Sequence, residues 1–256
     1  MSTAYERVRI ARSNDRPTGQ DFLQALCPNF VELHGDRLFG DDAAIIGGIG
    51  TVCGQAATII AIEKGHTGKE RTLRSFGSPH PEGYRKALRL MRQAEKFGRP
   101  VLCLVDTAGA YCGVDAEERG QGAAIAENLM GMMQLSVPIL TILIGEGGSG
   151  GALALAVADQ VWMLENAVYS VISAEGCASI LWKDAKKAAE AAESLQLTSE
   201  AAKRFGIVEE VISEQGLGTP DFYETLQKRI AEAWEELKKD PQLLEHRYER
   251  FRKYGR

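Results

Sequence analysis

The sequence predicts an α/β fold with a largely parallel β-sheet, and two patterns carry this prediction. The apolar runs at 100–106 and 138–144 lack the alternation of a half-exposed strand, so they predict strands buried on both faces. Segments with helical periodicity separate these runs along the chain. Strands that alternate with helices are typical of a parallel sheet covered by helices on both sides.

The composition is that of an ordinary globular protein. The chain has 256 residues, of which 45% are hydrophobic and 25% charged, enough for one large domain or two small ones. The net charge of −5 lacks the basic excess typical of nucleic-acid-binding proteins. The N-terminal residues carry charges throughout and no apolar run has the length of a membrane span, so we expect neither a secretory signal nor a membrane anchor.

The cysteines indicate a reducing compartment. Their number is odd, their spacing is wide, and most lie in apolar surroundings; they are Cys27, Cys53, Cys103, Cys112 and Cys177. We therefore expect free thiols and a cytoplasmic protein. The sequence has no C-x-x-C pair and its histidines are scattered, so no metal centre is expected in this chain.

An arm, a helix and a β-hairpin are expected in the first part of the chain. Only Gly54-Gln55 separates two strand-like runs, a length typical of a hairpin turn. The expected elements are, in order, a mobile or partner-bound arm (1–18), a short helix (19–33), two strands (43–52 and 56–63) and a long basic loop (64–81).

The rest of the chain should alternate strands and helices and end in a helical extension. Pro81-Glu82 opens a helix that Gly98 closes, and Thr219-Pro220 caps the last long helix. Besides the two buried runs, the expected elements are helices at 81–98, 117–135 and 150–158, short strands at 160–164, 168–172 and 207–212, and a mostly helical part beyond 175. We predict one domain over 19–256, with a C-terminal helical extension from about 219 whose charged end extends beyond the compact body.

Five glycines crowd the stretch GEGGSGG at 145–151, where a strand is expected to become a helix. Glycine weakens both strands and helices, so its abundance needs a reason. One reason is packing, because small residues let a helix approach a sheet closely. Phosphate-binding patterns do not fit: Ala152-Leu153 replaces the Lys-Ser/Thr pair of a P-loop, and the late chain position argues against a dinucleotide fingerprint.

A nucleophile elbow is a second interpretation of these glycines. Residues 147–151 fit the pattern G-x-S-x-G and lie between a strand and a helix, which is the context of that motif. A hydrolase would also need an acid and a histidine later in the chain. Only His246 follows Ser149, and it lies in the charged tail. The order of the residues therefore disfavours a hydrolase.

An oxyanion hole is the third interpretation. Glycines at a helix N-terminus leave backbone N–H groups accessible, and such groups stabilise negative charge that develops on an oxygen. A second glycine turn, at 106–111, follows the preceding buried strand. Two glycine turns at successive strand ends, each followed by a helix, predict a paired site that polarises carbonyl groups.

Five long motifs resemble the α subunits of bacterial acetyl-CoA carboxylase carboxyltransferases. They span residues 35 to about 183 in the order of that family, and the tail RYERFRKYG fits as well. The motifs are GDRLFGDDAAIIGGIG, SPHPEGYRKALRLMRQAEKFG, DTAGAYCGVDAEERGQ, GEGGSGGALAL and YSVISAEGCASILWK. The sequence departs from the family at Ala108, Cys112 and Ala174, where proline is common, and it largely lacks the N-terminal helical extension of longer members.

The resemblance implies a crotonase-like fold, in which β-β-α units form a spiral, with helical appendages at both ends. It implies that this subunit binds carboxybiotin carried on a separate biotin carboxyl carrier protein, with biotin carboxylase as a further partner. A zinc-bearing β subunit would bind acetyl-CoA in an α2β2 assembly, and activity would need both subunits. The implied reaction moves the carboxyl group from biotin to acetyl-CoA and gives malonyl-CoA for fatty acid synthesis.

The resemblance also assigns site residues. The N–H groups of Gly150 and Gly151 match the family positions that hold the ureido oxygen of biotin, which gains negative charge as the N–CO2 bond breaks. The remaining candidates for substrate binding are Gly147, Gly148, Gly109, Ala110 and Tyr111, and for the last three a structural role is an equal alternative.

Two further questions stay open at the level of sequence. The basic residues Lys64, Lys69, Arg71 and Arg74 either meet CoA phosphates or face solvent or a partner. The rival functions are a stand-alone crotonase-type acyl-CoA hydratase or isomerase, and a non-catalytic scaffold. A hydratase needs paired acidic residues in its pocket, whereas the close pair Glu117-Glu118 is expected in the first turn of a helix. A scaffold has no need of two glycine turns.

Overall fold

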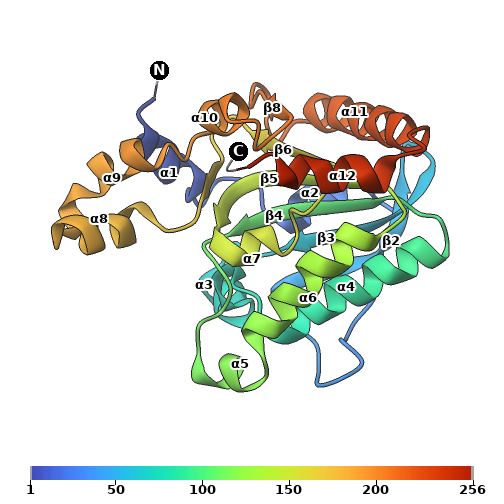
Figure 1. Ribbon diagram of the computed structural model, residues 1–256, viewed down its shortest axis with the longest axis horizontal. Coiled ribbons are helices and arrows are strands. Elements are labelled where there is room, and N and C mark those ends of the chain that lie inside the picture. The colour runs from blue at the N-terminus through green and yellow to red at the C-terminus, as the bar shows by residue number, and fades with distance from the viewer. Residues whose placement is uncertain (1, 255–256) are drawn as a thin grey trace.

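A computed structural model describes residues 2–254 and places their strands in one mixed sheet of eight (Figure 1). The strands are β1 (Val31–Glu32), β2 (Ile45–Val52), β3 (Gln55–Ile62), β4 (Val101–Thr107), β5 (Ile139–Gly148), β6 (Gln160–Leu164), β7 (Val168–Ser170) and β8 (Glu210–Ile212). The strand order is β1-β2-β3-β4-β5-β6-β8, and β7 pairs with the last residues of β5. Pairing is antiparallel from β1 to β3 and parallel from β3 to β8.

The predicted hairpin is confirmed, with its turn shifted by one residue. Val52 pairs with Gln55, so Cys53 and Gly54 form a two-residue turn. Both have positive φ angles, 48° and 76°, which is the backbone of a type I′ turn and matches the twist of the flanking strands. The buried runs predicted at 100–106 and 138–144 form β4 and β5.

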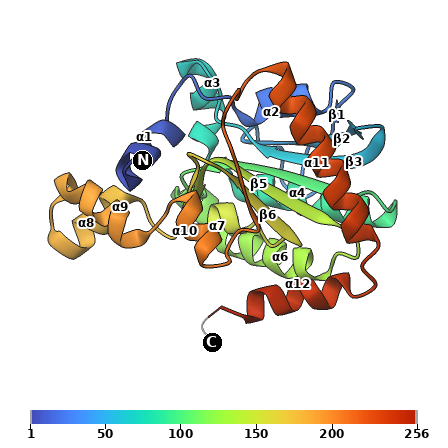
Figure 2. The ribbon, with the colours of Figure 1, turned by 90° about the horizontal axis from the view of Figure 1, so that it is seen from above.

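Helices cover the two faces of the sheet (Figures 1 and 2). On one side α4 packs against α6, and α12 also packs against α6. On the other side α2 packs against α11. The helices are α1 (Ala4–Ala11), α2 (Gly19–Leu26), α3 (Gly68–Leu73), α4 (Pro81–Lys96), α5 (Val114–Glu118), α6 (Gln121–Gln134), α7 (Ser149–Leu153), α8 (Ala174–Trp182), α9 (Ala188–Leu195), α10 (Ser199–Arg204), α11 (Pro220–Lys238) and α12 (Leu243–Arg252).

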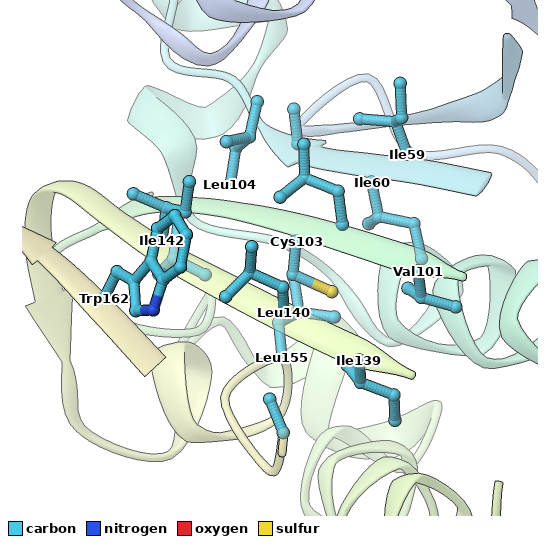
Figure 3. Close-up of a cluster of buried hydrophobic side chains, with 14 of the residues drawn as sticks. Ile59, Ile60, Val101, Cys103, Leu104, Ile139, Leu140, Ile142, Leu155 and Trp162 are labelled. Atoms are coloured by element: carbon cyan, nitrogen blue, oxygen red, sulfur yellow. The ribbon is translucent and has the colours of Figure 1, made fainter. Parts of the chain in front are cut away.

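The hydrophobic core lies on both faces of the central strands. Side chains of β3, β4 and β5 such as Ile60, Leu104 and Ile142 are inaccessible to solvent, and Figure 3 shows them with Leu155 and Trp162 packed around the sheet. This two-sided burial explains why the strands read as continuous apolar runs. Burial raises the pKa of the Cys103 thiol to about 12. All five cysteines have free thiols.

Several helices differ from the sequence prediction. The basic stretch 64–81 contains α3, and the helix expected at 117–135 is two helices divided at Gly120, whose φ of 82° interrupts the helical backbone. The helix expected at 150–158 spans only residues 149–153. The expectation that the charged tail extends beyond the compact body is wrong, because α12 packs on α6 and the side chain of Arg247 is buried.

The N-terminal residues form part of a small helical lobe on one side of the sheet (Figure 1). Ala4 and Val8 of α1 are buried against α9, with Ala191 and Leu197 in the same apolar cluster. The expected arm over 1–18 thus contains a helix that packs on its own chain. A domain boundary at residue 18, like the extension from about 219, stays a prediction. No helix within residues 2–254 has the length and apolar character that crossing a membrane requires.

Candidate functional site

The glycine stretch continues β5 before it turns into α7. Residues 145–148 are still part of the strand, and Thr107 at the end of β4 pairs with Gly147. Ser149 then begins α7 with a φ of 47°, a left-handed conformation that is uncommon outside glycine. The ends of β4 and β5 therefore bring the two predicted glycine turns side by side.

Close backbone packing explains two of the glycines. A Cβ on Gly148 would overlap the carbonyl oxygen of Ala108. A Cβ on Gly151 would overlap the backbone nitrogen of Ala110 and lie 2.8 Å from the carbonyl carbon of Gly109 and 2.9 Å from the Tyr84 hydroxyl oxygen. Glycine at 148 and 151 is thus required for the turn at 145–151 to touch the turn at 106–111. This confirms the packing explanation for both residues, and for Gly151 packing is a sufficient reason without any chemical role.

Gly150 is different, because packing does not require its small size. A Cβ there would meet only Ile125, with carbon–carbon distances of 3.8 and 3.9 Å, which is ordinary contact. Gly150 lines a cavity of about 550 Å³, together with Ser149 and Leu153. Other walls of this cavity are formed by the mainly apolar residues Ala156, Val161, Tyr169, Ser170, Val171, Ile207, Arg250, Phe251 and Tyr254. Gly150 therefore both lines this cavity and has free space around its Cα.

The helix that follows the glycine turn is short. It ends at Leu153, so its peptide dipoles give a weaker field at Gly150 than the predicted nine-residue helix would. Backbone N–H groups in the first turn of a helix still have no acceptor within the helix. Any stabilisation of negative charge by this turn therefore comes from its individual amide groups rather than from a helix dipole.

Tyr84 is a residue of the site that sequence reasoning missed. It lies on α4, the helix that the sequence predicted at 81–98. In the structure its buried hydroxyl donates a hydrogen bond to the carbonyl oxygen of Gly151, at 3.2 Å. Burial, with the nearby charge of Asp42, raises the pKa of this hydroxyl, so it stays protonated and remains a donor. No local pattern distinguishes such a tyrosine from a core residue.

Asp106 fastens the two strand ends together. Its Oδ1 accepts a hydrogen bond from the Glu146 amide at 2.9 Å, and its Oδ2 lies 2.5 Å from Nζ of Lys64. Arg71 and Arg74 donate to backbone carbonyl oxygens of Gly65 and Ala43. Three of the four basic residues singled out in the sequence therefore hold their own chain, and only Lys69 is wholly on the surface.

The second turn is held by hydrogen bonds and a ring stack, and it lies apart from the cavity beside Gly150. Thr107 Oγ1 accepts a hydrogen bond from the Gly109 amide at 3.0 Å. Tyr111 stacks on the ring of His80 with a centroid distance of 4.1 Å, and its amide donates to Pro79. Gly109 and Ala110 contact the glycine turn at Gly151, whereas Tyr111 does not line the cavity beside Gly150.

The strained φ of Ser149 is shared with nucleophile elbows, but the rest of a triad is missing from residues 2–254. All four histidine rings bond elsewhere: His34 to Asp41, His66 to Asp21, His80 to Ser75 and Arg119, and His246 to Asp240. The same residues contain no cluster of three His, Cys, Asp or Glu side chains suited to a metal ion.

Comparison with known proteins decides between the remaining interpretations. The family described as acetyl co-enzyme A carboxylase carboxyltransferase-like matches residues 2–255. The chain belongs to this family. It is 56% identical to the acetyl-coenzyme A carboxylase carboxyl transferase subunit alpha of Ruminiclostridium cellulolyticum, over 99% of this chain and 98% of that protein. The corresponding subunit of Streptococcus sanguinis is 57% identical, over 99% and 100%.

Solved structures show the carboxyltransferase fold at low sequence identity. Transcarboxylase 12S superposes with a TM-score of 0.72 and 21% identity, over 90% of this chain and 44% of that one. A chain of a Pseudomonas malonate decarboxylase hetero-tetramer gives a TM-score of 0.66 and 16% identity, over 91% and 87%. These likenesses, with the mixed sheet and its covering helices, confirm the predicted crotonase-like α/β fold.

Proposed function

We propose that this chain is the α subunit of an acetyl-CoA carboxylase carboxyltransferase, a transferase that moves a carboxyl group from carboxybiotin to acetyl-CoA and yields malonyl-CoA. Membership of the carboxyltransferase family along the whole chain supports this proposal. The name of the relatives, subunit alpha, supports a separate partner subunit. In the proposed assembly a zinc-bearing β subunit binds acetyl-CoA, the two subunits form α2β2, and a carrier protein delivers the biotin.

The observation that carries the site assignment is the accessible backbone at Gly150. Biotin's ureido oxygen becomes negative as its carboxyl group leaves, and preorganised N–H groups stabilise such an oxygen. We place this oxygen at the amides of Gly150 and Gly151, beside the 550 Å³ cavity, whose apolar walls suit the rest of a fused ring system. Gly147 and Gly148 support the turn from the β5 side, and Gly109 and Ala110 support it from the β4 side.

The cofactor, when bound, supplies the carboxyl group and a ureido nitrogen that can act as a base. The residues of this chain bind and orient: Tyr84 holds the Gly151 carbonyl, and Asp106 holds the Glu146 amide. A stand-alone hydratase is not favoured, because Glu117 and Glu118 lie exposed on α5 and do not line the cavity.

Substitution of Gly150 tests the assignment. Gly150→Val has room for its Cβ, which would meet only Ile125 at ordinary contact distance, so folding should be retained, but the branched group would stand directly beside the amides. With the β subunit present, transfer to biocytin should fall at least about tenfold, toward the 10²–10³ range typical of a lost oxyanion donor. Binding of acetyl-CoA, held by the partner, should be unchanged.

Gly122→Val is the matched control, because Gly122 is exposed on α6 with open space around its Cα. It should retain wild-type transfer. Wild-type kinetics in Gly150→Val, with a normal melting curve, would remove Gly150 from the oxyanion site. Full activity of the chain without any β subunit would contradict the proposed division between subunits.

A further inference from the structure

The N-terminal segment 12–16 is bonded directly to the strand that carries the glycine turn. Arg12, at the end of α1, donates from Nε to Glu146 Oε1 at 2.7 Å. Arg16 donates from Nε to the carbonyl oxygen of Ile144 at 2.7 Å. Two arginines from one short segment thus hold the residues on either side of Gly145.

Each arginine also holds a second part of the molecule. Arg12 donates from Nη1 to Glu175 of α8 at 2.8 Å, and Arg16 makes a bidentate pair with Glu214 at 2.9 and 2.5 Å. Only 3% of the Arg16 side chain is exposed, and each of its three guanidinium nitrogens donates a hydrogen bond, two to the carboxylate and one to the Ile144 carbonyl. A planar guanidinium fixes the relative position of such partners better than a flexible ammonium does.

The bonded residues are adjacent to the proposed chemistry. Glu146 precedes Gly147 in the chain, and its side chain is only 17% exposed. Arg12 and Glu146 line a small cavity of about 50 Å³ together with Gly147, Gly148 and Ser149. The arginine therefore lies next to the turn. Val8 lines the same cavity from α1, which packs this helix against the turn.

We infer that Arg12, assisted by Arg16, is a positioning residue that fixes the glycine turn for carboxyl transfer. This inference rests on the proposed function, because it assumes that the amides after Glu146 face the reacting oxygen. The N-terminal segment then belongs to the active-site machinery rather than to a separate arm. Partly exposed ion pairs contribute little to stability, so loss of Arg12 should act through the geometry of the turn.

Arg12→Gln is the direct test, with the β subunit and biocytin as carboxyl acceptor. A displacement of the turn should lower kcat about tenfold and raise KM for biocytin, while KM for malonyl-CoA, the carboxyl donor in this direction, stays constant. Arg12→Lys should be intermediate, because a lysine reaches one carboxylate at a time. Arg9→Gln, an exposed residue of the same helix, is the matched control and should behave as wild type.

Partner variants separate the two tethers. Glu146→Ala should reproduce the loss of Arg12→Gln, and the double variant should be no worse than either single one. Glu175→Gln leaves the Arg12–Glu146 pair in place and should stay within about twofold of wild type. Additive losses in the double variant, or a loss in Arg9→Gln equal to that in Arg12→Gln, would overturn the inference.

Amide hydrogen exchange on the full chain gives a readout independent of transfer. The amides of 147–151 should exchange faster in Arg12→Gln than in Arg9→Gln, while those of β3 and β4 are unchanged. Unchanged exchange and unchanged kcat in Arg12→Gln would overturn the inference and leave the proposed function intact. Absence of transfer by the wild-type chain with β would instead overturn the proposed function, and exchange alone would then decide whether Arg12 orders the turn.

Discussion

The two ends of β5 are held by the two ends of the chain, and by the same kind of residue. At the carboxyl end of the strand, Arg16 from the N-terminal segment donates to Ile144. At the amino end, Arg247 of α12 pairs with Asp159, whose Oδ2 accepts a hydrogen bond from the Ile139 amide at 2.7 Å. Both arginines are buried, with residue exposures of 5% and 1%.

The partners of the two arginines differ. Arg247 donates to the carbonyl oxygens of Met132, Leu135 and Val137, which are the orphan acceptors at and beyond the end of α6, so it acts as a C-terminal cap. Arg16 and Arg12 instead join two other segments, through the carboxylates of Glu214 and Glu175, to the strand that bears the glycine turn. We expect the amino end of β5 to govern stability and its carboxyl end to govern the site.

Removal of Arg247 should have the largest effect on folding. Arg247→Ala would leave Asp159 buried without its cation and three carbonyl oxygens without a donor, at a cost of about 3–5 kcal/mol in the free energy of unfolding. Urea unfolding of the chain measures this loss. Arg252→Ala, an exposed change on the same helix, should stay within about 0.5 kcal/mol of wild type.

The kinetics of the same variant sharpen the comparison. At a temperature where Arg247→Ala is folded, its kcat and KM with the β subunit should match wild type. A loss of kcat as large as that of Arg12→Gln would show that both ends of β5 control the turn, and the contrast between them would be lost.

Gly151→Ala should have an intermediate effect, located at the site end. Its Cβ would overlap the backbone of Ala110 and press on Gly109, so one of the two turns must shift, at about 1–3 kcal/mol as for other overpacked sites. Gly150→Ala, one residue earlier, has the space it needs and should be close to neutral in urea unfolding. Equal stability of the two variants would contradict the close packing of the turns.

Acid sensitivity at the site end should be the smallest of the three effects. Burial raises the pKa of Glu214, but the hydrogen bond and charge of Arg16, with help from Asn166, outweigh it and leave that pKa below its ordinary value of 4.5. A carboxyl with a depressed folded-state pKa contributes stability above 4.5, and loses it as pH falls through the folded value. Glu214→Gln should therefore be less stable than wild type at neutral pH. Its free energy of unfolding should also fall less steeply as the pH is lowered.

The measurement is the free energy of unfolding from pH 7 down to pH 3, with Glu236→Gln on the exposed face of α11 as the control. The control should retain the wild-type slope. An acid limb in Glu214→Gln as steep as that of wild type would mean that the Arg16–Glu214 pair contributes no net stability.

The sequence by itself determined the parts of this protein that depend on neighbours along the chain. Continuous apolar runs predicted β4 and β5, because a strand buried on both faces needs no polar alternation. Two glycine turns after successive runs predicted that these turns lie side by side, since parallel strands bring their carboxyl ends to one edge of the sheet, and Thr107 does pair with Gly147. The long motifs predicted the family, which the whole-length match confirms.

Only the tertiary structure decided which distant residues hold these parts in place. Arg16 reaches a carbonyl 128 residues away and Arg247 a carboxylate 88 residues away, so no local pattern could pair them. The same holds for Gly151, which must lack a side chain because Gly109 and Ala110 of the other turn pack against it, and for Tyr84, whose hydroxyl donates to the carbonyl of that glycine. Periodicity reports which face of an element is apolar, whereas the partner of a buried polar group depends on how the whole chain folds back on itself.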